Sequence, residues 1–69
     1  MMDRHSYRIV VAGRMGTLST DAFTPYAVEV DGAVSVITAR DVDQSALFGL
    51  LRRVESLALQ LVEVKRDPS

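Results

Sequence analysis

Residues 26–39 read YAVEVDGAVSVITA and decide the fold. Apolar and polar side chains alternate from Tyr26 to Asp31, a β-rich run follows over residues 33–40, and Asp31-Gly32 separates the two. A period of two is typical of a strand, and Asp-Gly between β-rich runs is the strongest short hairpin signal. Both turn residues tolerate the positive φ of a type I′ turn. The stretch therefore predicts an antiparallel hairpin of strands 26–31 and 33–40.

The flanking segments add two strands and a helix. Residues 7–12 (YRIVVA) and 59–65 (LQLVEVK) are rich in β-branched and aliphatic residues, which predicts a first and a last strand. Between the hairpin and the last strand, leucines and valines recur at steps of three and four, which predicts a helix over about residues 43–57. Asp41 or Asp43 would cap it, and Gly49 would allow a close approach to the sheet.

This order predicts an α+β fold, the ferredoxin-like split β-α-β arrangement with a four-stranded antiparallel sheet in the order 4-1-3-2. The first and third strands carry apolar groups on both faces, as central strands require. The connection over residues 13–25 is short, so its helix is expected to be short or absent. Whether residues 17–24 are helical stays open, with Leu18 and Phe23 expected in the core.

Composition narrows the class of protein. The 69 residues allow one domain, 1–69, with residues 1–6 and 67–69 expected to be frayed. There is no cysteine and one histidine, so we expect neither a disulfide nor a metal, and no cofactor. A net charge of −1 gives nucleic-acid binding little support. No apolar run approaches the roughly 20 residues of a membrane helix, and a cytoplasmic location is expected.

A single helix covers only part of one sheet face, and a chain this small has little stability to spare. We therefore expect the far face to be covered by a second copy, or by a larger protein on which the chain docks as an accessory subunit. The residues assigned to that interface are Tyr7, Val10, Ala12, Ile37 and Ala39. The alternative is that small side chains leave a weakly apolar surface that needs no partner.

The segment Gly13-Arg14-Met15-Gly16-Thr17-Leu18 follows the first strand. Amides in a glycine-bracketed turn can bind an anion, and Arg14 could bind a carboxylate, although an ordinary turn is the simpler interpretation. The segment resembles the corresponding loop of ACT domains, which are small regulatory domains, and Asp43 to Val64 is similar to their closing helix and strand. The resemblance implies a β-α-β-β-α-β fold, pairing through sheets or helices, and a small-ligand site at Gly13, Arg14, Met15 and Gly16. The chain also resembles short stand-alone actinobacterial proteins of unknown function.

No pattern predicts an enzyme. His5 lacks a visible partner, Asp41 and Asp43 are explained by helix capping, and Ser19-Thr20-Asp21 has no second histidine to complete a nucleophilic set. The sequence thus predicts a non-catalytic interaction or regulatory module, with an ACT-type sensor of an amino acid or other carboxylate as the alternative. Ligand, partner, pathway and oligomeric state are left open.

Overall fold

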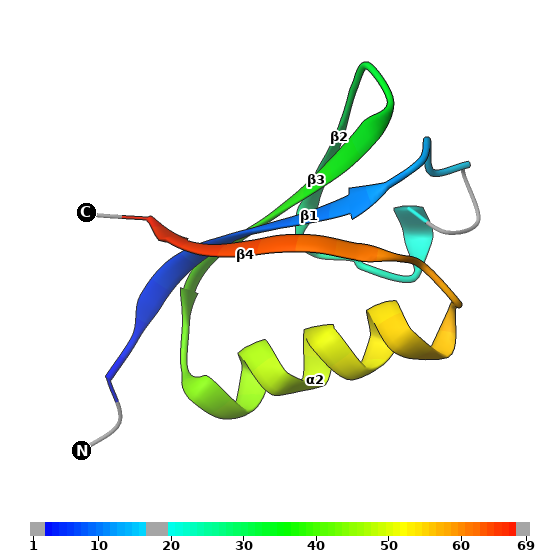
Figure 1. Ribbon diagram of the computed structural model, residues 1–69. Helices are drawn as coiled ribbons and strands as arrows, with labels where there is room; N and C mark the ends of the chain where they lie inside the picture. Colours follow the sequence, from blue (N-terminus) through cyan, green and yellow to red (C-terminus); the bar gives the residue numbers. More distant parts are fainter. Residues whose placement is uncertain (1–2, 17–19, 68–69) are drawn as a thin grey trace.

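The computed structural model describes residues 3–16 and 20–67, which form a four-stranded sheet and one long helix (Figure 1). The elements are β1 (His5–Ala12), β2 (Ala27–Asp31), β3 (Val34–Val42), α2 (Gln44–Ser56) and β4 (Leu61–Asp67). β1 begins two residues before the predicted start and β4 continues to Asp67, so His5, Ser6 and Asp67 belong to strands. Leu18 lies outside the described residues, as does the part of the possible first helix over residues 17–19.

The sheet is antiparallel throughout, which confirms the α+β class. Its order is β2-β3-β1-β4, so β1 and β3 are central while β2 and β4 are edges. Each neighbour pair of the predicted order 4-1-3-2 is present in it: β4 with β1, β1 with β3, and β3 with β2. Central strands need apolar groups on two faces, and β1 and β3 supply them.

The hairpin turn differs from the predicted one by a residue. Asp31 pairs with Val34, so the two-residue loop is Gly32-Ala33 rather than Asp31-Gly32. Gly32 has a φ of 61°, while Ala33 does not adopt a positive φ. A type I′ turn needs positive φ at both positions, so the I′ prediction is wrong, and glycine at the first position is the pattern of a type II′ turn.

Both ends of α2 are closed by local hydrogen bonds. Oδ1 of Asp43 accepts a bond of 2.8 Å from the amide of Ala46, which confirms Asp43 as the cap and excludes Asp41 from that role. At the other end the amides of Ala58 and Leu59 donate to the carbonyls of Glu55 and Val54, a Schellman motif with Ala58 at φ 57°. Within the helix, Gly49 is exposed and a Cβ there would meet nothing within 4 Å, so the predicted close approach to the sheet is wrong.

The hydrophobic core lies between the sheet and α2. It is closed at one end by the connection after β1, whose Phe23 is completely buried. Thr20 and Asp21 are helical and residues 22–25 form turns, so the described part of the possible first helix is short. Nη1 of Arg53 on α2 donates to the carbonyl of Ala22 at 2.7 Å. The helix and this connection therefore share one side of the sheet, and the core consists of Ile9, Val11, Phe23, Ile37, Ala39, Val42, Leu47, Leu50 and Val54. The fold of the described residues is a two-layer structure with one side of its sheet uncovered.

Candidate interaction surfaces

The sheet surface opposite α2 is called here the open face. Strand register defines it, because residues that pair across antiparallel strands point to the same side. Val10 pairs with Val36 and Glu63, and Arg8 pairs with Thr38 and Lys65. The face consists of Arg8, Val10, Ala12, Ala27, Glu29, Asp31, Val34, Val36, Thr38, Glu63 and Lys65.

The register corrects the predicted interface. Ile37 pairs with Ile9 on the helix side, and both Ile37 and Ala39 are 0% exposed. Tyr7 pairs with Ala39 and packs against the same core. Of the five predicted interface residues, only Val10 and Ala12 lie on the open face. The sequence shows which residues alternate within each strand, but it does not show how two distant strands align. That alignment decides which residues of β1 share a sheet face with which residues of β3.

The open face has an apolar middle and a charged rim. Val10, Val34 and Val36 are half-buried and line a hollow of about 260 Å³, together with Arg8, Asp31, Glu63 and Lys65. The long side chains among these, Arg8 and Lys65, have methylene stems of the kind that cover apolar neighbours while the charge stays in water. The face is therefore less apolar than the bare strand pattern predicts.

Larger apolar exposure lies along β4 and the adjoining side of α2. Every residue of β4 is exposed, including Leu61 at 47%, Val62 at 56% and Val64 at 37%, and Phe48 on the helix is 50% exposed. We call Phe48, Leu61, Val62 and Val64 the β4 strip. Sequence reasoning expected the helix to cover only part of one sheet face, but it missed this surface because the pattern does not show which strand the helix leaves exposed. The predicted order 4-1-3-2 already places this strand at an edge of the sheet, and that position was the available signal of its exposure.

A hollow of about 540 Å³ opens at one end of the β4 strip, between the start of β1, the start of α2 and the end of β4. Its walls include Phe48 and Arg66, and the rings of His5 and Tyr7 meet edge to face with centroids 6.3 Å apart. The full lining is Asp3, His5, Tyr7, Gln44, Leu47, Phe48 and Arg66. His5 is thus part of a strand and an aromatic pair.

The predicted ligand loop, Gly13 to Gly16, is held against the sheet by its own amides. The amide of Gly13 donates to the carbonyl of Ala33 at 2.7 Å, and that of Met15 donates to Oγ of Ser35 at 3.0 Å. Ser35 Oγ donates in turn to the carbonyl of Gly13 at 2.9 Å and is completely buried. Arg14 and Gly16 are exposed, and Met15 packs partly against the core. Two of the loop's four amides are therefore engaged within the protein.

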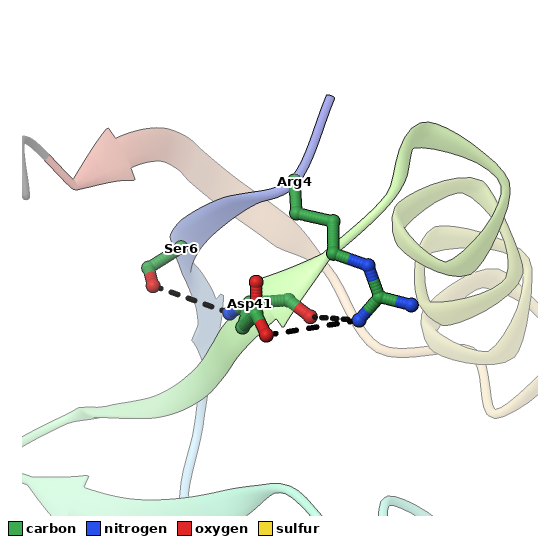
Figure 2. A network of polar contacts seen from close by, with 3 residues as sticks. All are labelled: Arg4, Ser6 and Asp41. Atoms are coloured by element: carbon green, nitrogen blue, oxygen red, sulfur yellow. Dashed lines mark hydrogen bonds and ion pairs between the residues drawn. The ribbon is translucent and has the colours of Figure 1, made fainter. Parts of the chain in front are cut away.

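Asp41 has a structural position distinct from that of Asp43. It lies beside a register shift between β1 and β3 with a φ of 53° (Figure 2). Its amide donates to Ser6 Oγ at 3.3 Å, and Nη1 of Arg4 lies 3.2 Å from its carbonyl oxygen and 3.7 Å from its Oδ2. Asp41 therefore lies at a β-bulge between β1 and β3, whereas Asp43 caps α2.

Among residues 3–16 and 20–67, no three His, Asp or Glu side chains lie close enough together to bind a metal ion. In that same part of the chain, no helix combines the length and apolar character needed to cross a bilayer.

These features define a class: a small α+β domain with a four-stranded antiparallel sheet covered on one side, an exposed edge strand that is part apolar and part charged, and a mixed polar–apolar open face. A family model described as a domain of unknown function, DUF8691, matches residues 6–65, and the chain belongs to this family. No curated protein and no solved structure matches the chain significantly.

Proposed function

We propose that this protein is a non-catalytic interaction module that works by self-association, a second copy covering sheet surface that its own helix leaves uncovered. The observation that supports the proposal is the exposure of β4, which α2 leaves uncovered. Val62 and Val64 are 56% and 37% exposed, and Phe48 on α2 is 50% exposed.

The size of the domain favours the same conclusion. Small domains bury a modest fraction of their surface and usually gain stability from disulfides, metals or association. The sequence has no cysteine, which leaves disulfides out. At about 25 cal/mol per Å² of apolar surface, covering several exposed valine, leucine and phenylalanine side chains contributes a few kcal/mol, which is comparable to the net stability of a domain this small.

We also infer that the architecture is the ferredoxin-like split β-α-β arrangement with a shortened first helix. The strand order and the long crossover through α2 support this inference. A cytoplasmic location remains part of the proposal, supported by the lack of cysteine.

Light scattering coupled to gel filtration, run from low micromolar to millimolar chain concentration, tests self-association. The proposal predicts a mass that rises from the 7.6 kDa of one chain towards twice that value. A measured mass that stays equal to the mass of one chain over the whole concentration range contradicts the proposal. A second chain that co-purifies at fixed stoichiometry while this chain remains monomeric would identify it as an accessory subunit and also reject self-association.

A further inference from the structure

We infer that two copies associate edge to edge through β4, in antiparallel register about Val64, to form a continuous eight-stranded sheet. This inference rests on the proposed self-association and names the surface and the register that it uses. It commits to a second copy of this chain because the charges and apolar groups of β4 complement themselves under a two-fold axis.

The position of β4 supplies the first argument. It is seven residues long, lies at the edge of the sheet and, within the described part of the chain, pairs with β1 alone (Figure 1). An unpaired edge presents amide and carbonyl groups that can pair with another strand. The other edge strand, β2, has five residues and contains two carboxylates, Glu29 and Asp31, on the open face. β4 is the longer edge and carries both charge signs.

The charge pattern supplies the register. In a two-fold antiparallel pair centred on Val64, Glu63 of each copy lies opposite Lys65 of the other, on the open face. Opposite charges at paired positions stabilise a sheet, and like charges destabilise it. A centre on Glu63 or on Lys65 instead places that residue opposite its own copy. Val64 is also the middle residue of Leu61–Asp67, so the favourable register is the one with the longest overlap.

The neighbouring strand supplies an independent argument. Within one copy, Lys65 lies directly opposite Arg8 on β1, which places two positive charges side by side. Among the described residues, the only ion pair within 4.0 Å joins Arg4 to Asp41, so neither cation is paired there. Glu63 of the second copy would lie on the other side of Lys65 and supply the missing carboxylate.

On the helix side of the same interface, the register places Val64 opposite Val64 and Val62 opposite Arg66, whose partner on β1 is Tyr7. The two Val64 side chains, each 37% exposed in one copy, would contact each other, and Arg66 would lie between this contact and the hollow that Phe48 lines. One contact therefore pairs the open edge, neutralises the Lys65 charge and buries Val64 together with part of Val62. The largest apolar side chains of the open face are Val10, Val34 and Val36, which are already half-buried, so covering that face would bury less apolar surface.

Single-cysteine cross-linking tests the register, because the native chain has no cysteine. The two-fold axis passes beside residue 64, so the Cα atoms of Val64→Cys from two copies would lie about 4.5–5.5 Å apart, within disulfide range. In a glutathione redox buffer we expect most Val64→Cys chains to form a covalent dimer, while the control Val36→Cys, at the middle of the open face, stays largely monomeric.

Charge exchange provides a second test that does not depend on oxidation. Glu63→Lys and Lys65→Glu each place like charges across the interface twice, and we expect each to raise the dimer dissociation constant about tenfold. Mixing the two single variants, or combining both changes in one chain, restores complementary pairs and should recover native affinity. Glu55→Lys, the same charge change on the exposed side of α2, serves as the matched control.

The possible outcomes distinguish the β4 interface from self-association in general. Cross-linking at residue 64 with rescue by charge exchange supports the β4 interface. A dimer that cross-links through Val36→Cys and ignores the charge changes overturns the β4 interface but retains self-association through the open face. A protein that is monomeric at every concentration removes both.

Discussion

The buried hydroxyl of Ser35 offers a quantitative test of the structure, because this side chain ties the loop after β1 to the sheet. Its Oγ accepts from the amide of Met15 at 3.0 Å and donates to the carbonyl of Gly13 at 2.9 Å, and the residue is 0% exposed. Ser35→Ala removes both bonds and leaves two backbone groups without their partner. At about 1 kcal/mol per bond, we expect a loss of roughly 2 kcal/mol in the free energy of unfolding.

Urea denaturation followed by circular dichroism measures this loss at one fixed chain concentration, since association shifts apparent stability. A change of 2 kcal/mol corresponds to a fall in melting temperature of about 8–16 °C in a domain of this size. Ser45→Ala, on the exposed side of the first helical turn, is the matched control and should change stability by less than about 0.5 kcal/mol. Equal and small effects of both substitutions would refute the described role of Ser35.

Four further predictions follow from single positions. Ala58→Gly should stabilise the protein by roughly 0.5–1 kcal/mol in urea denaturation, because Ala58 adopts a φ of 57°; a loss would contradict the Schellman cap. Gly49→Ala should add about 1 kcal/mol by the same assay, since the new Cβ meets nothing within 4 Å; destabilisation would indicate a hidden contact. Asp43→Ala should cost about 1 kcal/mol, with Asp43→Asn nearly neutral, and a neutral alanine variant would exclude the cap. Amino acids at millimolar concentration should not shift the melting temperature, and a shift abolished by Arg14→Ala would revive the ligand-sensor hypothesis.

Local patterns predict the elements of this chain well. The Asp31-Gly32 pair marked the hairpin, and the leucine and valine spacing marked α2, because both signals depend on residues close in sequence. The capping role of Asp43 was also predictable, since a short acidic side chain before an amphipathic run satisfies the first amides of a helix.

Arrangements that depend on distant residues were harder to predict. Ile37 and Ala39 were placed on the wrong side because the register of β3 against β1 is set by contacts across more than twenty residues. Gly49 was assigned a contact that the helix does not make, because the position of α2 over the sheet cannot be derived from its own periodicity. The exposure of the β4 strip follows from that same helix position.

The ligand loop illustrates a different limit. Gly13 and Gly16 suggested free amides, but the amide of Met15 is occupied by Ser35, which lies twenty residues further along the chain. Ser35 was predicted only as a strand residue, and nothing in its neighbourhood indicated that its hydroxyl would be buried against another segment.

Hydrogen–deuterium exchange of the native chain at two concentrations tests the central claim most directly, because it reports edge pairing without any substitution. If a second copy covers β4, the amides of β4 should exchange more slowly as the chain concentration rises, while those of the other edge strand, β2, should not change. Exchange in β4 that is independent of concentration, in a range where the protein is shown to associate, would contradict the β4 interface.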